Sequence, residues 1–395
     1  MTADRICSIL FYLFITAVTC KMACQIQPYQ TGESIWICGQ RTVKSFQNRL
    51  YFAAIFVILF LMSALRFGIG NDYWQYTQTA HEVYVGGYVV TEVGFNWLVK
   101  FLYLLSSGEY YELVFAVFAF ATLFFFLKAF VEQSVCFSQS FFLFMTLGLY
   151  FQTFNTVRYY LALSIALFSI QYVLKKDFLK FVFWIGLAAL FHKSVLLVIP
   201  VYWIALLNWK KWQIVAGLVI SAVCFVGRGV ILKLALVLYP SYKNTIYLAG
   251  GGSLFGTLRT LAVLAFYAWF LYSRAFVGQE YRKHPLKPLL AAQSWYPELR
   301  FYGHLNLLAF VTGTFFSFLP VVTRISYYFG ISQLFMIPLI LEQIQDIKTQ
   351  KKVKGILFVI CLTSFFVFLL QAHQEGVGLL PYRSWLFETQ RYVHK

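Results

Sequence analysis

The chain is a succession of continuous apolar runs separated by short polar connections, from one end to the other. Only helices and closed barrels satisfy every backbone group in lipid, and a barrel would need apolar and polar residues to alternate along each strand. These runs are continuous, so they indicate helices. The uncharged runs lie at 6–20, 50–65, 113–127, 137–154, 159–174, 181–191, 194–207, 212–227, 260–273, 301–319, 325–341 and 355–370. The pattern predicts an all-α polytopic integral membrane protein, with residues 1–395 forming a single transmembrane domain.

Composition supports this class and removes one alternative. Hydrophobic residues make up 60% of the chain and charged residues only 12%, about half the roughly 25% of a soluble domain. The net charge of +17 would indicate nucleic-acid binding if the basic residues gathered on one soluble face. They lie instead in short connections between apolar runs, which is typical of membrane orientation. We therefore expect the lipid bilayer as a partner and no nucleic acid.

The cysteines and the first apolar run carry weaker signals. Three of the seven cysteines (Cys20, Cys24 and Cys38) lie near one another, but no histidine accompanies them and a fourth zinc ligand is missing. We expect free or structural thiols, no metal and no cofactor. The run from Ile6 to Thr19 resembles the apolar core of a signal peptide, yet no A-x-A-like cleavage site follows it. We interpret it as a retained first helix.

The basic residues also set the orientation. Connections rich in Lys and Arg are expected in the cytoplasm, and five connections together with Lys128 hold nineteen of the 32 basic residues. The five connections are 21–49, 175–180, 208–212, 274–300 (including the predicted cytoplasmic loop 275–300) and 348–354. The remaining connections are then external, among them outer loops at 66–110 and 229–256. The chain would cross the membrane about twelve times, with both termini outside.

Two parts of this topology are unusual. Residues 178–207 leave room only for a short hairpin, whose tip carries the sequence His-Lys-Ser at 192–194. Residues 94–108 are apolar but short, and Lys100 interrupts them. The outer loop is external and the basic connection at 175–180 is cytoplasmic, so the chain must cross the membrane an odd number of times between them. Three full apolar runs already lie there. We therefore interpret 94–108 as an amphipathic helix on the outer surface. Phe95, Leu98, Leu102 and Leu105 would form one of its faces.

This topology places the unusual charged residues on the outer side. A charged residue at membrane depth costs several kcal/mol, so a cluster at helix ends is a candidate site. The residues concerned are Arg66 and Asp72 in RFGIGNDYWQY, Arg158 in FNTVRYY, His192 and Lys193 at the hairpin tip, Arg228 and Arg259 beside a Gly-rich loop, Arg324 in LPVVTRISYYF, and Arg383 in PYRSW. Four aromatic residues beside these charges (Tyr73, Trp74, Tyr76 and Tyr159) are candidates for contact with sugar rings.

Each of these signals has a structural alternative. An arginine near a helix end more often extends to lipid phosphates than binds a substrate. A lone membrane histidine is usually a satisfied structural residue, and we interpret His304 in this way. The convergence of Arg66, Arg158 and Arg324 near His192 favours a functional site.

Guanidinium groups match the paired acceptor oxygens of a diphosphate. When the diphosphate is a leaving group, arginines stabilise the charge that grows in the transition state without a metal. The chain also lacks the several acidic residues at membrane ends that a metal-dependent diphosphate site needs. No nucleotide sugars exist outside the cytoplasm, so the natural diphosphate-activated donor there is a polyprenol-linked glycan.

Three segments resemble a known family. RFGIGNDYWQY (66–76), the block 155–204 with its FHKS sequence, and RISYYF (324–329) are similar to the EpsG-type branch of the Wzy polysaccharide polymerases. The resemblance covers about residues 50 to 385, and the middle block is its most specific part. Tyr159 departs from the family pattern, which has Gln after the helix-opening arginine. The resemblance implies a fold like that of the metal-independent GT-C glycosyltransferases. It also implies assembly of O-antigen, capsule or exopolysaccharide at the bacterial inner (cytoplasmic) membrane.

Together these observations predict a multi-pass glycosyltransferase that polymerises undecaprenyl-diphosphate-linked repeat units, with its active site facing the periplasm. Arg158 and Arg324 would bind the donor diphosphate, supported by Arg66. His192 is the first candidate for the general base, because an ordinary histidine pKa of about 6.5 suits that role, and Asp72 is the second. The expected protein partners are the flippase and the chain-length regulator of the pathway. Two alternatives remain open: an O-antigen ligase that uses the same donor, and a flippase or transporter of lipid-linked glycans.

Overall fold

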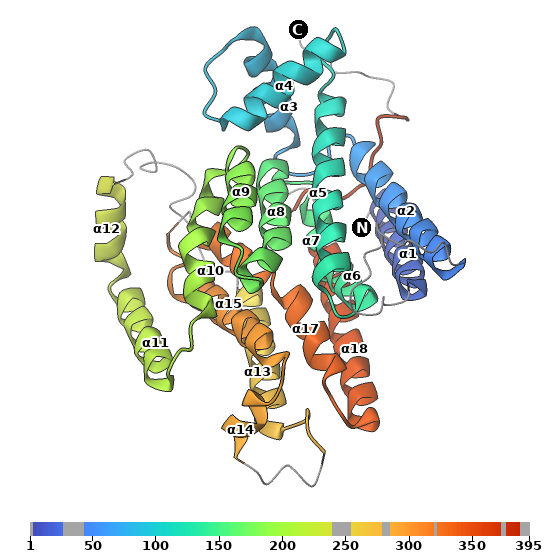
Figure 1. Ribbon diagram of the computed structural model, residues 1–395. Helices are drawn as coiled ribbons and strands as arrows, with labels where there is room; N and C mark the ends of the chain where they lie inside the picture. The colour runs from blue at the N-terminus through green and yellow to red at the C-terminus, as the bar shows by residue number, and fades with distance from the viewer. Residues whose placement is uncertain are drawn as a thin grey trace. The chain divides into compact units, whose positions relative to one another are not determined.

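The computed structural model describes residues 3–26, 43–238, 254–278, 285–319, 322–372 and 377–387. These residues form helices joined by turns, and within these ranges the only β-type pairing is an isolated bridge between Arg66 and Ser384 (Figure 1). The helices are α1 (Ala3–Gln25), α2 (Val43–Ala64), α3 (Tyr73–Val85), α4 (Val93–Leu105), α5 (Tyr111–Gln133), α6 (Phe137–Thr146), α7 (Leu149–Gln152), α8 (Val157–Leu174), α9 (Phe178–Ala189), the 3-10 helix η1 (Lys193–Leu197), α10 (Val198–Leu206), α11 (Lys211–Val226), α12 (Arg228–Leu238), α13 (Leu254–Ser273), α14 (Leu286–Ala291), α15 (Tyr296–Phe315), α16 (Val322–Gly330), α17 (Gln333–Glu342) and α18 (Ile347–Gln371). The predicted all-α class is confirmed.

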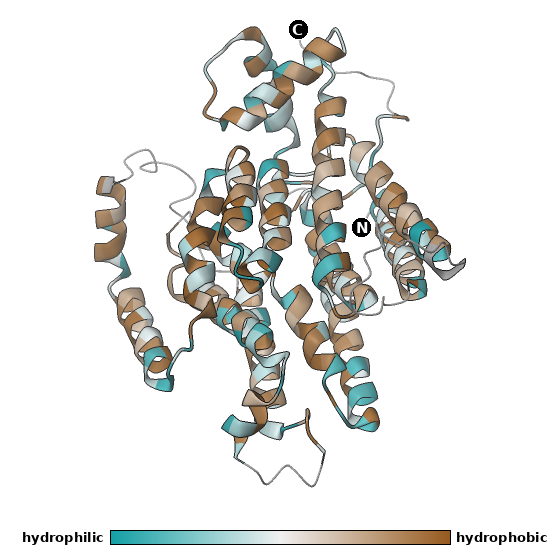
Figure 2. Ribbon diagram, in the orientation of Figure 1, coloured by the Kyte–Doolittle hydropathy of each residue, from teal (hydrophilic) through white to brown (hydrophobic). Residues whose placement is uncertain are grey.

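Seven of the described helical segments are long and apolar enough to cross a membrane, and an eighth arises if α11 and α12 are one span bent by 79°. The seven are α1, α2 from Phe46, α5, α8, α13, the segment Arg324–Glu342, and α18. Figure 2 shows α5 and α18 apolar along most of their length, with a hydrophilic end on α18. A multi-pass membrane protein is therefore confirmed, whereas the twelve crossings and the GT-C-like architecture stay predictions.

The predicted short hairpin corresponds to two short apolar segments, Phe178–Ala189 and Lys193–Leu206. A helix rises 1.5 Å per residue, so the 12-residue α9 is about 18 Å long and shorter than the roughly 30 Å hydrocarbon core of a bilayer. The predicted run at 137–154 is divided, because Gly148 adopts a positive φ of 73° between α6 and α7. The apolar pattern thus located the long apolar helices but not the breaks within them.

The chain divides into two compact units. Unit 1 comprises 1–168, 186–193 and 352–395, and unit 2 comprises 169–185 and 194–351. In unit 2, α16 packs along α15, and the Tyr202 hydroxyl donates a hydrogen bond to the Tyr328 carbonyl oxygen at 2.9 Å. In α15, the Nδ1 atom of His304 lies 2.7 Å from the Ala205 carbonyl oxygen, and the His304 ring stacks on the Trp209 ring. These contacts agree with the structural interpretation of His304.

In unit 1, the predicted outer loop 66–110 contains two helices, α3 and α4, where the sequence predicted one. The helix α4 coincides with the predicted amphipathic segment, but its buried stripe is rotated from the predicted face: Phe95, Val99, Leu102 and Tyr103 are buried, whereas Leu105 is 70% exposed and Leu98 is half-buried. The rotation follows from packing, because α3 and α5 contact α4. The Tyr103 ring meets Tyr84 of α3, and the Phe95 ring meets Phe118 of α5. The exposed side is apolar as well (Trp97, Phe101, Leu104), which suits a helix at a lipid surface.

The other two predicted loops also contain helical structure. The outer loop 229–256 includes most of α12 and the first residues of α13, while residues 239–253 lie outside the described ranges. The cytoplasmic loop 275–300 includes α14 and the start of α15, while residues 279–284 lie outside the described ranges.

Candidate functional site

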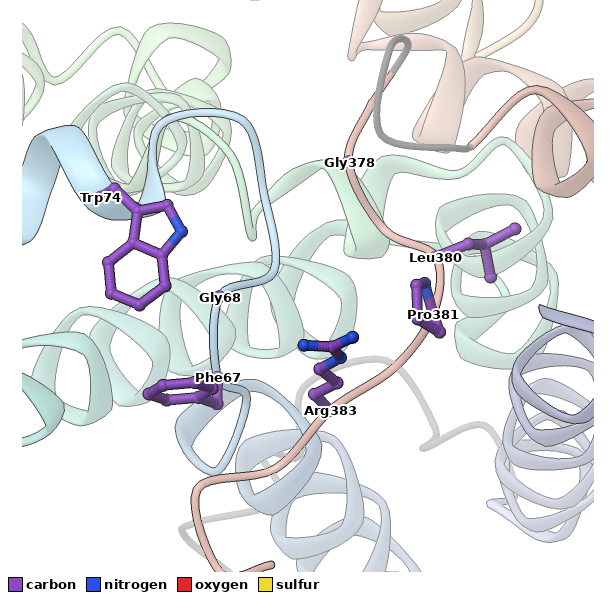
Figure 3. A pocket seen from close by; sticks show the side chains of 7 residues that line it. All are labelled: Phe67, Gly68, Trp74, Gly378, Leu380, Pro381 and Arg383. Atoms are coloured by element: carbon purple, nitrogen blue, oxygen red, sulfur yellow. The ribbon is translucent and has the colours of Figure 1, made fainter. Parts of the chain in front are cut away.

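The loop that joins α2 to α3, residues 66–72 (the glycine loop), is held against the segment 377–387 (the C-terminal segment). The Phe67 amide donates to the Arg383 carbonyl oxygen at 3.0 Å, and the Gly70 amide donates to the Gly378 carbonyl oxygen at 2.9 Å. Figure 3 shows the two segments running beside each other. Gly70 has a φ of 101°, and a Cβ there would lie 2.4 Å from the Phe154 carbonyl oxygen. The loop conformation therefore requires glycine at position 70.

Arg66 begins this loop and is buried, with 2% of its surface exposed. Its guanidinium carbon lies 4.9 and 5.1 Å from the ring centroids of Phe115 and Phe154, and Nη1 donates to the carbonyl and hydroxyl oxygens of Ser63. Nε and Nη2 have no hydrogen-bond partner among the described residues. Burial lowers the pKa of Arg66 to about 10, so the group stays charged at neutral pH. Arg66 fixes the glycine loop from the protein interior.

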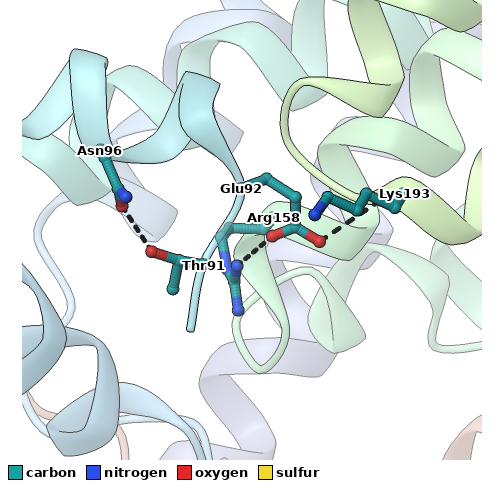
Figure 4. A network of polar contacts seen from close by, with 5 residues as sticks. All are labelled: Thr91, Glu92, Asn96, Arg158 and Lys193. Carbon is teal, nitrogen blue, oxygen red and sulfur yellow. Dashed lines mark hydrogen bonds and ion pairs between the residues drawn. The ribbon is translucent and has the colours of Figure 1, made fainter. Parts of the chain in front are cut away.

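A second cluster joins three segments that are distant in the sequence (Figure 4). Arg158, at the start of α8, forms an ion pair with Glu92 through Nη1 and Oε2. The other carboxylate oxygen of Glu92 accepts a hydrogen bond from the Lys193 backbone amide at 3.3 Å. The side chains of Arg158 and Glu92 are 19% and 15% exposed. A partly buried pair of this kind is screened less by salt than a surface pair. We call Glu92, Arg158, Lys193 and their neighbours His192, Tyr159 and Tyr76 the arginine cluster.

The hairpin tip is fixed to the start of α4 by a close backbone approach. The Gly94 amide donates to the Leu190 carbonyl oxygen at 2.9 Å, and a Cβ on Gly94 would lie 2.6 Å from that oxygen. The His192 ring meets the Tyr159 ring edge-on, with centroids 5.3 Å apart. The structure therefore places His192 beside the residue that follows Arg158.

Tyr76 is the member of the arginine cluster that lies on α3, the helix that follows the glycine loop. Its ring centroid lies 5.6 Å from the Arg158 guanidinium carbon. Burial raises the pKa of Tyr76, and the charge of Arg158 and a hydrogen bond with it act in the opposite direction. The negative charge of Asp72 also acts to raise that pKa, which places Asp72 within electrostatic range of Tyr76. The Asn71 backbone amide donates a hydrogen bond to Asn155 Oδ1 at 2.9 Å. This bond ties the loop that carries Asp72 to Asn155, which precedes Arg158 by three residues.

The four aromatic residues predicted to contact sugar differ in exposure. Tyr73 is 1% exposed and stacks on Phe115, with ring centroids 4.6 Å apart. Tyr159 is 4% exposed, and Tyr76 is half-buried. Trp74 is 43% exposed. In this conformation Trp74 has the most accessible ring of the four.

The remaining predicted diphosphate ligand, Arg324, lies in the first turn of α16 and has an exposed side chain. It belongs to unit 2, whereas Arg66, Asp72, Arg158 and His192 belong to unit 1. No group of three or more His, Cys, Asp or Glu side chains in the described part of the chain is placed to hold a metal ion. The expectation of a metal-free site stays a prediction.

Sequence reasoning did not identify Glu92 as part of the site. Two signals pointed to it: acidic residues are rare in this chain, with 15 Asp and Glu in 395 residues, and Glu92 directly precedes α4. Negative charge is favourable at a helix N-terminus, so the sequence alone explains Glu92 as a residue that stabilises the start of α4. Its second role depends on the packing of α4 against α8 and the hairpin tip.

Fold and site together define a class of protein: a multi-pass membrane protein in which a buried arginine, a paired arginine and a histidine lie on neighbouring segments of unit 1. The sequence model of the EpsG family matches residues 49–384, which is most of the chain. The chain belongs to the EpsG family, as the three resembling segments predicted. Membership implies a membrane protein of the polysaccharide-polymerase type. No curated protein and no solved structure matches the chain.

Proposed function

We propose that this protein is a membrane glycosyltransferase that polymerises undecaprenyl-diphosphate-linked oligosaccharide repeat units at the periplasmic face of the bacterial inner membrane, without a metal. The observation that carries the proposal is the arginine cluster, in which Arg158 pairs with the Glu92 carboxylate and the His192 ring contacts Tyr159, the residue after Arg158. A guanidinium group for an anionic leaving group and a base for an acceptor hydroxyl are the two components that metal-free glycosyl transfer requires.

We assign the main contact with the donor diphosphate to Arg158. Its planar guanidinium already holds one carboxylate, Glu92, and the oxygens of a diphosphate match the same donors. The donor would replace or share the position of the Glu92 carboxylate. Arg324, with its exposed side chain, would supply a second guanidinium group. Arg66 is buried, so we assign it to positioning of the glycine loop instead of direct contact.

The chemical step is a substitution at the anomeric carbon of the donor glycan. The acceptor hydroxyl oxygen forms a bond to that carbon while the bond from the carbon to the diphosphate oxygen breaks. Undecaprenyl diphosphate leaves with the electron pair, and Arg158 and Arg324 stabilise its growing charge. His192 takes the proton of the acceptor hydroxyl, and Asp72 is the alternative base. The flippase and the chain-length regulator of the pathway would supply the substrate and limit the product.

The decisive test uses purified protein in liposomes and the lipid-linked repeat unit extracted from source cells. We expect a ladder of products with two, three and more repeats, and none with Arg158→Gln. Lys100→Gln, which removes an exposed positive charge on α4, should give the wild-type ladder. Transfer of glycan only to a lipid A core acceptor would identify a ligase. Movement of the substrate across the bilayer without covalent change would identify a flippase. Either result would overturn the proposal.

A further inference from the structure

A pocket of about 120 Å³ lies between the glycine loop and the C-terminal segment. Its lining consists of Phe67, Gly68, Trp74, Gly378, Leu380, Pro381 and Arg383. All of these residues belong to unit 1, and the backbone hydrogen bonds described above fix both walls. The pocket is therefore built from two segments about three hundred residues apart in the sequence.

The walls have the chemistry of a saccharide site. The Trp74 ring is 43% exposed and is held edge-on against Phe67, with centroids 5.6 Å apart. A Cβ on Gly68 would lie 3.3 Å from the indole, so glycine leaves space beside the ring. A flat and partly exposed indole offers an apolar surface on which the C–H groups of a pyranose can lie. Such a ring also presents a large contact area at low cost in conformational entropy, because a tryptophan side chain has only two rotatable bonds.

Arg383 supplies the polar group of the pocket. Its side chain is exposed, and Figure 3 shows its guanidinium directed between the backbone at Gly68 and Pro381. None of the ion pairs among the described residues involves Arg383, and the lining contains no acidic side chain. Five N–H donors in a fixed plane can bind sugar hydroxyl or carboxylate oxygens.

The pocket and the arginine cluster lie on different sides of α3. Trp74 and Tyr76 are two residues apart on this helix, and an α-helix turns by about 100° per residue, so their side chains point about 200° apart. Tyr76 contacts Arg158, whereas Trp74 lines the pocket. A ligand in the pocket would therefore be a part of the substrate other than the diphosphate.

We propose that this pocket binds a single sugar residue of the glycan, with the pyranose ring on Trp74 and its polar groups on Arg383. The proposal rests on the proposed polymerase function, because the glycan is the substrate of that reaction. It assigns recognition of the sugar to the glycine loop and the C-terminal segment, and binding of the leaving group to Arg158.

The test is saturation-transfer NMR with the repeat oligosaccharide released from its lipid by mild acid, which removes the diphosphate. We expect binding to wild type and to the matched control Trp97→Ala, a tryptophan that is 75% exposed on α4. Trp74→Ala and Arg383→Gln should each weaken binding by on the order of tenfold, equivalent to about 1.4 kcal/mol. Size-exclusion profiles of the variants in detergent establish that they fold.

Two results would overturn the proposal: equal oligosaccharide binding by wild type and Trp74→Ala, or binding of inorganic diphosphate that depends on Arg383 and not on Trp74. The second would show an anion site instead of a sugar site. These outcomes are independent of the product ladder. A ladder without Trp74-dependent binding would refute only the pocket, and Trp74-dependent binding without a ladder would refute only the polymerase.

Discussion

The Glu92 carboxylate is paired with the Arg158 guanidinium, although 66 residues separate them in the sequence. Arg158 also lies over the rings of Tyr76 and Phe95, at 5.6 and 5.3 Å from their centroids. These contacts hold the guanidinium in one orientation before any substrate arrives. An arginine prepared in this way stabilises developing charge without reorganising during the reaction.

Replacing Arg158 with Lys tests the planar geometry of the cation. Lysine keeps the charge but loses the two-point donor arrangement, so we expect the polymerisation rate to fall by on the order of 10²–10³ with normal membrane insertion. We expect the same for Arg324→Lys. Arg49→Lys, an exposed arginine near the start of α2, is the control and should keep full activity. Normal polymerisation by the Arg158 and Arg324 variants would show that both arginines only anchor the protein to lipid.

Glu92→Gln separates donor binding from catalysis. The neutral amide no longer competes as an anion for Arg158, while its oxygen can still accept a hydrogen bond from the Lys193 amide. We expect the KM for the donor to fall by roughly threefold to tenfold, a change of about 0.7–1.4 kcal/mol. Initial rates over a range of donor concentrations give this value, with Glu82→Gln on α3 as the control. A higher donor KM would show that the carboxylate does not occupy the donor position.

His192→Gln tests the general base. Glutamine keeps hydrogen bonding and much of the volume but cannot accept the proton, so turnover should fall by roughly 10²–10⁴ while donor binding persists. A base must be unprotonated to act, so the wild-type rate should also decrease as the pH falls below about 6. Initial rates at saturating donor are measured with a donor-binding assay on the same preparations. A rate within about tenfold of wild type would assign the base to Asp72, and Asp72→Asn would then be the damaging change.

Gly70→Ala tests the conformation of the glycine loop. The φ of 101° and the close approach to the Phe154 carbonyl oxygen leave no room for a methyl group, so we expect a cost of about 1–3 kcal/mol and loss of activity. Gly186→Ala is the matched control, because a Cβ there meets nothing within 4 Å and alanine favours a helix. Thermal denaturation of both variants gives the comparison. Equal stability of the two would contradict the structural role of Gly70.

The topology is tested by single cysteines in a background without native cysteines. Gly87 in the outer loop and Lys351 before the last apolar run are both exposed. In intact spheroplasts, a membrane-impermeant maleimide should label Gly87→Cys and should label Lys351→Cys only after permeabilisation. Labelling of Lys351→Cys in intact spheroplasts would reverse the predicted orientation and move the site to the cytoplasmic face.

The sequence predicted helices wherever apolar residues run continuously, because this signal is local. It did not predict α3, since polar residues interrupt Tyr73–Val85 so that no continuous apolar run forms, and the burial of Tyr73 depends on Phe115 of α5. It placed Arg158 near His192 through topology, and the structure has the Tyr159 and His192 rings in contact. The Glu92 pair and the pocket at Trp74 were not predicted, because both depend on contacts between segments far apart in the chain.

The pairing of the glycine loop with the C-terminal segment has a consequence for genetics. A stop codon directly after α18 would preserve every described helix that is long enough to cross the membrane. It would nevertheless remove Gly378 and Arg383, whose carbonyl oxygens accept hydrogen bonds from the glycine loop. Such a late truncation should still insert into the membrane and nevertheless behave as a null allele.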